Sequence, residues 1–168
     1  HDPRNIARKA VNYMKSAGIA DGVQAAPELE FYVFDDVRFD QNTHSGYYFL
    51  DSREGSWNTG RVEGPNLGYK LRSREGYFPL PPADSLHDVR TEMMLTMLEC
   101  GLKIEGHSHA GGAAGQGSID LLTDDLVKAG DNVLKSKYIV KNVARKFGRT
   151  ATFMPKPLFD ENGSGMPV

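Results

Sequence analysis

The sequence predicts an α+β fold with a largely antiparallel sheet, and two observations indicate this class. The coarse order of hydrophobic patterns is helix, two strands, long loop, helix, two strands, helix, strand. The chain has 168 residues, of which 39% are hydrophobic and 25% charged, as in globular domains with a buried core. We therefore expect residues 1–168 to form a single domain.

The first element is predicted to be a helix that begins at an Asp-Pro pair, residues 2–3. Apolar residues Ile6, Ala10 and Met14 recur every four positions, and Gly18 is a plausible C-terminal stop. This spacing places the apolar residues on one face, which we expect to pack on a sheet.

In residues 26–34, successive side chains alternate between two sets, as expected for a β-strand whose side chains point to opposite faces. One face carries Leu29, Phe31 and Val33. The opposite face carries Glu28 and Glu30, followed by aromatic residues that would partly cover it. Residue spacing alone favours two interpretations equally: a solvated strand face, or a pair of functional carboxylates.

The next region is a predicted hairpin followed by a long irregular loop. Turn-forming residues at 40–46 precede a short strand at 47–51. From residue 52 to residue 83 regular patterning fades, and three prolines interrupt the end of this stretch. A loop of this length usually has a binding or covering role.

A second helix is expected from an N-cap at Asp84 or Ser85 to a stop at Gly101. Its apolar stripe is Val89, Met93, Met97 and Leu98. The single cysteine, Cys100, is expected to be a small buried residue rather than a nucleophile.

Residues 103–120 are predicted to form one wall of a site. Glu105, His107 and His109 alternate, which places them on one face of a strand, and a Gly/Ala-rich stretch with Gln116 near its end follows. A transition-metal site on these three residues is a weaker hypothesis. Three such residues span about 13 Å of strand, too far for one ion.

The longest helix is expected from residue 123 to about residue 147, with Gly148 as its stop and a strand at 150–154 after it. Its apolar side is predicted to comprise Leu126, Ala129, Val133, Tyr138, Val140, Ala144 and Phe147.

Composition bounds the partners. The net charge of −2 favours neither nucleic acid nor an anionic membrane, and no apolar run approaches the ~20 residues of a membrane span. With one cysteine and no signal peptide, we expect a cytoplasmic location. Neither end has a usual terminus, so we expect an internal piece of a longer protein.

The chain resembles the type I glutamine synthetase family, specifically the first half of its catalytic domain. The resemblance rests on the order and spacing of short stretches that cover nearly the whole sequence: residues 2–7, 27–31, 57–60, 66–69, 76–84, 137–144, 150–157 and 162–166. It implies half of a catalytic domain built on a curved, largely antiparallel sheet with helices packed on one side.

The resemblance also implies an activity and its cofactors. Family members use ATP to phosphorylate glutamate, and ammonia then displaces phosphate to give glutamine. Two divalent metals, Mg²⁺ or Mn²⁺, neutralise charge during phosphoryl transfer and take oxygen ligands. The family assembles its active sites between subunits, so a homo-oligomer is implied.

Individual residues carry family roles by the same resemblance. Glu28 and Glu30 match the metal-binding Glu-x-Glu pair, and Glu105 matches a residue at the nucleotide site. Tyr77 matches a tyrosine of the ammonium pocket. Asn162 and Gly163 match the loop that holds glutamate.

Three positions depart from the family pattern. Ala110 and Ser118 replace metal-binding glutamates, and Pro167 replaces a metal-binding histidine. Because alanine offers no donor and a hydroxyl is a poor substitute for carboxylate, we expect weak or absent metal and ATP binding. We predict that this chain alone does not make glutamine. The alternative is a non-catalytic binding or self-assembling module on the same scaffold.

Overall fold

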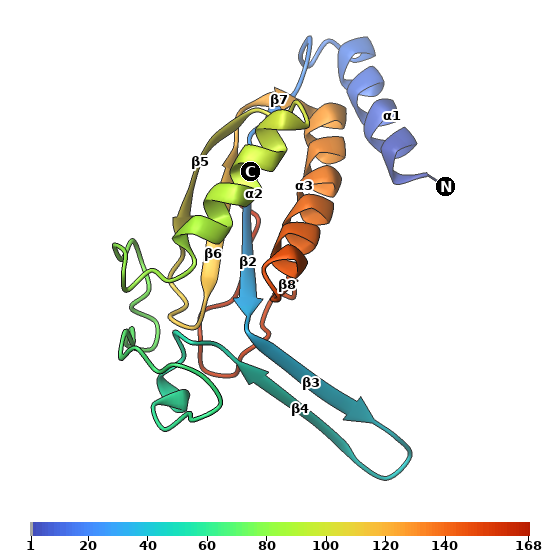
Figure 1. Cartoon of the computed structure of the whole chain (residues 1–168). Helices are drawn as coiled ribbons and strands as arrows, with labels where there is room; N and C mark the ends of the chain where they lie inside the picture. Colours follow the sequence, from blue (N-terminus) through green and yellow to red (C-terminus); the bar gives the residue numbers. More distant parts are fainter. Residues whose placement is uncertain (1) are drawn as a thin grey trace.

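A computed structural model describes residues 2–168, and its centre is a four-stranded antiparallel sheet in the order β5-β6-β2-β8 (Figure 1). The strands are β2 (Glu28–Phe34), β5 (Ile104–His109), β6 (Gln116–Leu121) and β8 (Thr150–Thr152). Short strands β1 (Gln24–Ala25) and β7 (Asp124–Asp125) form a separate antiparallel pair. The predicted α+β class with an antiparallel sheet is confirmed.

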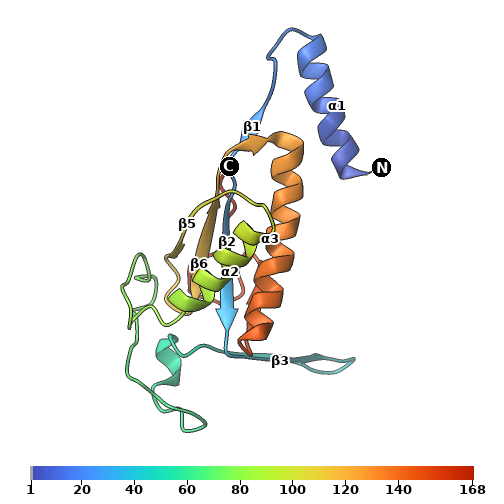
Figure 2. The same ribbon diagram turned by 45° about the horizontal axis from the view of Figure 1, so that its top comes forward.

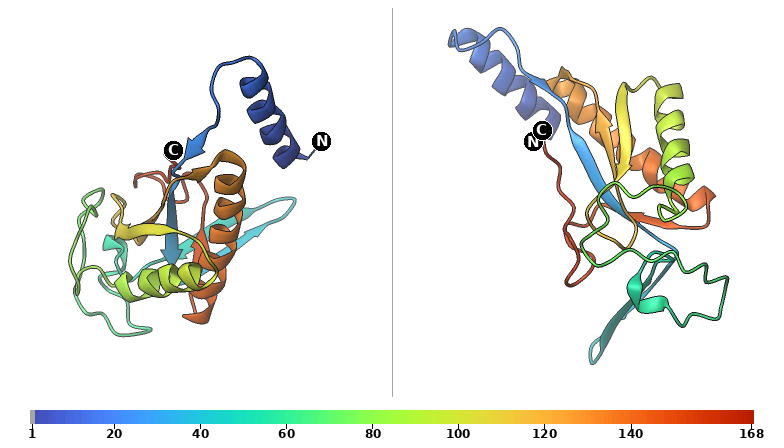
Figure 3. Two further views of the ribbon diagram at one scale, coloured as in Figure 1. Left: turned by 90° about the horizontal axis from the view of Figure 1, so that it is seen from above. Right: turned by 90° about the vertical axis from the view of Figure 1, so that its left-hand side faces the viewer.

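Helices α2 (His87–Glu99) and α3 (Leu126–Lys146) cover one face of this sheet, as Figure 3 shows. The main core lies between them and the sheet, where Phe31 and Val33 of β2 meet Met93 and Met97 of α2 and Val140 of α3. The opposite face of β2 carries Tyr32 and Phe34, which stack with ring centroids 5.7 Å apart and are also buried. The second half of β2 is therefore covered on both faces, whereas Glu28 and Glu30 at its start are only partly buried.

Each helix ends two residues before the glycine that was predicted to stop it. Gly18, Gly101 and Gly148 all have positive φ, between 66° and 79°, a conformation that other residues adopt at a cost. The predicted N-cap of α2 is wrong: Leu86 occupies that position without a side-chain cap. Asp84 is instead buried and accepts a hydrogen bond from the Leu86 amide at 3.3 Å.

Helix α1 (Pro3–Ser16) does not pack on the sheet, which corrects the expectation for its apolar stripe. It lies apart from the strands (Figure 2), and none of its residues is buried. An ion pair links it to the body, between Arg4 and Asp131 of α3, with Nε and Oδ1 2.9 Å apart. The amphipathic spacing therefore predicted the helix correctly, but the expectation that its apolar face packs on the sheet was wrong.

Four further burial predictions are wrong. Cys100 is exposed at the C-cap of α2. Leu98 and Phe147 are each 44% exposed and Tyr138 is 71% exposed, so all three lie outside the apolar stripes to which they were assigned. Leu98 and Tyr138 are each one position away from a buried residue of the stripe, where periodicity discriminates poorly, and Phe147 is the C-cap of α3.

The predicted hairpin is present as β3 (Asp36–Gln41) and β4 (Gly46–Asp51), and it projects away from the sheet (Figure 1). The segment after it is irregular up to α2, with one short 3₁₀ helix, η1 (Ser56–Asn58). None of the helices within residues 2–168 combines the length and apolarity needed to cross a membrane.

Candidate functional site

The open face of the sheet, opposite α2 and α3, carries the two glutamates of β2. Glu30 lies opposite Ser118 of β6, and Ser118 lies opposite Ser108 of β5. The two serine hydroxyl oxygens are 3.0 Å apart and hydrogen-bonded. One row across three strands therefore holds one carboxylate and two neutral hydroxyls.

The neighbouring row holds Glu28, Asp120 and Gly106. Burial raises the pKa of Glu28, and the nearby charges of Asp120 and Glu30 raise it further, against a hydrogen bond from Ser118. Burial and the Glu105 carboxylate raise the pKa of Asp120. Like charges gathered on this face therefore favour protonation of both groups.

These two raised pKa values predict a pH dependence. A carboxyl whose pKa is raised on folding stabilises the fold below its unfolded pKa, about 4, and this contribution is lost as pH rises through the folded value. The Glu28→Gln variant is therefore expected to melt at a higher temperature than the unaltered chain at pH 7, with the difference disappearing below about pH 4. Thermal melts between these limits check this. Glu99→Gln, an exposed change on α2, is the control, and a lower melting temperature for Glu28→Gln at pH 7 contradicts the prediction.

The two histidines of β5 lie on the helix-covered face, away from Glu30. Ile104 pairs with Leu121 and His107 pairs with Ile119, so residues three apart face the same side. A β-bulge between Ile104 and Gly106 makes this possible. The bulge separates the exposed Glu105 from the histidine row, so the expected alignment of Glu105, His107 and His109 is wrong.

Both histidines interact with neighbouring side chains of the protein. His109 is buried, and its Nε2 lies 3.0 Å from Oε2 of buried Glu54. Burial is the largest influence on the pKa of His109 and lowers it, but the hydrogen bond and charge of Glu54 and the hydrogen bond with the Ala110 carbonyl together outweigh burial, so the pKa is raised. Burial, together with the charge of Arg90, lowers the pKa of His107 to about 4. His107 is neutral at physiological pH, and its Nε2 contacts Thr91 Oγ1 at 3.0 Å.

The C-terminal segment 162–167 lies along the open face of the sheet (Figure 3). The Gly165 amide donates to Glu30 Oε2 at 2.5 Å, and the Glu28 amide donates to the Pro167 carbonyl at 3.0 Å. Tyr32 Oη donates to the Asn162 carbonyl. The Gln116 side chain donates to the Gly163 carbonyl at 3.0 Å. The structure thus brings the proposed glutamate-binding loop next to Glu30.

The other predicted positions lie around this face without converging on it. Ala110 is buried directly after β5, and its amide donates to the Gln116 carbonyl at 2.9 Å. Tyr77 is 73% exposed, and its ring contacts Phe78 at a centroid distance of 4.4 Å. The adjacent Gly76 amide donates to the Gly111 carbonyl at 2.9 Å, which fastens this loop beside Ala110.

The residues present do not fit a metal ion held by three side chains. Within residues 2–168, no three histidine, cysteine, aspartate or glutamate side chains are arranged to hold one. Ser118 is bonded to Ser108, and one oxygen of Glu30 accepts from Gly165. Sequence reasoning missed Asp120 and Ser108, although strand alternation from Ser118 would have placed Asp120 on the same face.

The fold and this face define a class: an α+β protein with a carboxylate-bearing site on the open side of an antiparallel sheet. A family model described as "Glutamine synthetase, catalytic domain" matches residues 1–168. This chain belongs to the glutamine synthetase family, as part of its catalytic domain.

Individual relatives agree with this assignment. The chain is 53% identical over 164 residues to glutamine synthetase of Microchaete diplosiphon and 46% identical over 166 residues to that of Escherichia coli K12, covering 98% of this chain and 35% of each relative. The cryo-EM structure of Plasmodium falciparum glutamine synthetase superimposes with a TM-score of 0.87 at 29% identity, covering 98% of this chain and 32% of that one. The chain thus spans about a third of the length of these relatives.

Proposed function

We propose that this chain supplies the Glu-x-Glu strand and the surrounding sheet of a glutamine synthetase catalytic domain, and that by itself it does not form glutamine. Glutamine synthetases are ligases of nitrogen metabolism that in general use ATP and divalent metal ions. Their substrates, glutamate, ammonia and ATP, are the ligands this chain would bind within a complete site. The proposal concerns a chain that spans 35% of its relatives.

One observation carries the proposal of inactivity, namely the row of Glu30, Ser118 and Ser108. A neutral hydroxyl lies directly opposite Glu30, where a second carboxylate would be needed to share a hard cation. Phosphoryl transfer depends on charge neutralisation by such cations. With Ala110 buried and offering no donor, this face supplies too few ligands for that chemistry.

Roles for four other residues remain part of the proposal. Asn162 and Gly163 would hold glutamate, since their segment lies against Gln116 and Tyr32 beside Glu30. Tyr77 would contribute to the ammonium pocket and Glu105 to nucleotide binding. Both are exposed, as residues that act on ligands from outside the sheet must be.

A γ-glutamyl transfer assay with Mn²⁺ tests the proposal. The purified chain is expected to give no product above the enzyme-free blank, while an intact glutamine synthetase serves as the positive control. Since losing even a residue that supports a metal ligand typically lowers affinity or activity ~10–100-fold, the loss of direct ligands should exceed that range. Robust turnover by the chain alone would overturn the claim.

Self-association is the second candidate function, and the β3–β4 hairpin favours it. Phe39 and Tyr48 face each other across the two strands and are 75% and 65% exposed. Tyr47 and Phe49 are also exposed, at 61% and 45%. A two-stranded hairpin is marginally stable in water, and exposed apolar patches mark interaction sites. We propose that a second copy of the chain covers this hairpin.

Light scattering at increasing concentration tests this second candidate. The unaltered chain is expected to show a rising mean mass, and the Phe39→Ser/Tyr48→Thr variant is expected to remain monomeric. Leu80→Ser removes an exposed apolar side chain outside the hairpin and should leave the mass unchanged. A monomer at every concentration for the unaltered chain counts against self-association.

A further inference from the structure

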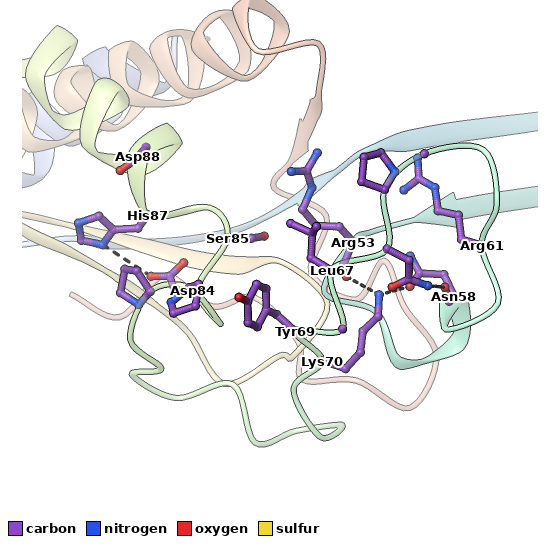
Figure 4. A pocket seen from close by; sticks show the side chains of 16 residues that line it. Arg53, Asn58, Arg61, Leu67, Tyr69, Lys70, Asp84, Ser85, His87 and Asp88 are labelled. Atoms are coloured by element: carbon purple, nitrogen blue, oxygen red, sulfur yellow. Dashed lines mark hydrogen bonds and ion pairs between the residues drawn. The ribbon is translucent and has the colours of Figure 1, made fainter.

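A hollow lies between the irregular segment and the beginning of α2 (Figure 4). Its volume is about 460 Å³, within the range of about 300–1,000 Å³ typical of small-molecule sites. Residues between Arg53 and Lys70 form one side, and residues between Pro81 and Asp88 form the other. No lining residue belongs to β2, β5 or β6, so this hollow is separate from the face that bears Glu28 and Glu30.

Three cationic side chains line the hollow from one side, namely Arg53, Arg61 and Lys70 (Figure 4). Arg53 pairs with Asp35 and Arg61 pairs with Asp51, each at 3.2 Å, and neither aspartate is among the lining residues. A guanidinium has five N–H donors, so each pair leaves donors available for a ligand.

Lys70 is held in place by its own neighbours. Its ammonium donates to the Arg53 carbonyl at 2.5 Å and to the Asn58 side-chain oxygen. Burial lowers the pKa of Lys70, which indicates a partly desolvated charge. An ammonium has three donors, so this group too can reach a ligand.

The acidic residues of the lining offset only part of this charge. Asp84 is buried and paired with buried Arg90 at 2.5 Å, so its charge is already neutralised. Asp88 is the other lining carboxylate and is exposed. It lies in the first turn of α2, a helix of 13 residues without a side-chain cap. The partial positive charge of that helix end adds to the field of the three cations.

Apolar side chains complete the walls. Tyr69 and Leu67 are 45% and 69% exposed, and Figure 4 shows Tyr69 between the cationic side and the side of Asp84 and His87. Prolines at positions 65, 81 and 82 also line the hollow. A ligand with an apolar body would cover these surfaces, whereas an inorganic ion would leave them in water.

We propose that this hollow binds a small organic anion. Its carboxylate or phosphate group accepts hydrogen bonds from Arg53, Arg61 and Lys70, and its apolar body lies against Tyr69 and Leu67. The shared chemistry is an anionic group on a compact, partly apolar body.

Titration with phenyl phosphate, benzoate and neutral phenol tests the proposal. Binding is measured by calorimetry and by the fluorescence of Trp57, the only tryptophan, which is next to lining residue Asn58. Both anions are expected to bind saturably and phenol at least about tenfold more weakly, because neutral phenol offers no anionic oxygen to accept charge-assisted hydrogen bonds from the three cationic side chains. Tighter binding of phenyl phosphate favours a phosphate ester as the class of ligand, and tighter binding of benzoate favours a carboxylate.

The Arg53→Gln/Arg61→Gln variant is designed to keep the fold. Asp35 keeps its ion pair with Arg149 at 3.2 Å, and Asp51 still accepts a hydrogen bond from the Asn58 side-chain NH₂ at 2.8 Å. We expect it to weaken anion binding at least about tenfold. Arg72→Gln, an exposed change outside the lining, should alter binding less than about twofold.

Salt provides a test that needs no variant. Because 1 M KCl shortens the screening length to about 3 Å, it should weaken anion binding by the unaltered chain. The proposal is overturned if the anions do not saturate, if phenol binds as tightly, if the double variant binds normally, or if salt has no effect.

Discussion

Replacing Ala110 and Ser118 together with glutamate is expected to lower the melting temperature of the chain in EDTA by about 10 °C. Ala110 is 4% exposed and Ser118 is 1% exposed, and Ser118 lies opposite Glu30. Both new carboxylates would therefore be buried, and the one at position 118 would also lie opposite Glu30. Uncompensated buried charge typically costs about 3–5 kcal/mol. The substitution also removes the hydrogen bond between the Ser118 and Ser108 hydroxyls.

A neutral variant of matched size separates charge from volume. Ala110→Gln/Ser118→Gln adds similar bulk without charge and is expected to destabilise less than the glutamate pair. Adding Mn²⁺ should restore part of the stability of the glutamate variant, because a ligand that binds only the folded state stabilises it, and should leave the unaltered chain unchanged. An unchanged or higher melting temperature for the glutamate variant in EDTA would contradict this account.

Asp84→Ala is expected to produce the second large effect, a loss of about 3–5 kcal/mol in the free energy of unfolding. Arg90 is 1% exposed, and its Nη2 lies 2.5 Å from Asp84 Oδ2. Within residues 2–168, Nε and Nη1 of Arg90 have no hydrogen-bond partner, so the ion pair is its principal compensation. Removing the carboxylate leaves an uncompensated charge between α2 and the sheet. Urea denaturation measures the change.

The double variant Asp84→Ala/Arg90→Met is the control for this prediction. It removes both charges, so it is expected to be more stable than Asp84→Ala alone. A double variant less stable than the single one would show that Arg90 contributes mainly through packing. The Arg90 side chain packs closely against Gly117, since a Cβ at Gly117 would lie 2.6 Å from Arg90 Cδ.

Local pattern was sufficient for most elements. Alternation in residues 26–34 predicted a strand with Phe31 and Val33 in the core, and the structure places both there. The pattern also left open whether Glu28 and Glu30 were solvated, and both are half-buried on a face covered further along by Tyr32 and Phe34. These features depend on the two-residue period of a strand, which is encoded within a few neighbouring residues.

The histidines of β5 show where local pattern fails. Perfect alternation put Glu105, His107 and His109 on one face, but a bulge of one residue separates Glu105 from the other two. The bulge arises from pairing with β6, ten or more residues later in the chain. Residue spacing within one strand carries no information about such a shift.

The sequence by itself determined the α+β class, the glycines that end the helices and the family, and the resemblance drew attention to Ala110, Ser118 and Pro167. Only the tertiary structure decided what surrounds these residues: the Ser118 hydroxyl is hydrogen-bonded to that of Ser108, and Gly165, two residues before Pro167, donates to Glu30. It also decided that α1 stands apart from the sheet and that the long loop forms a cationic hollow. The physical reason is that helix and strand periods act over a few residues, whereas cross-strand partners and cavity walls come from segments far apart in the chain.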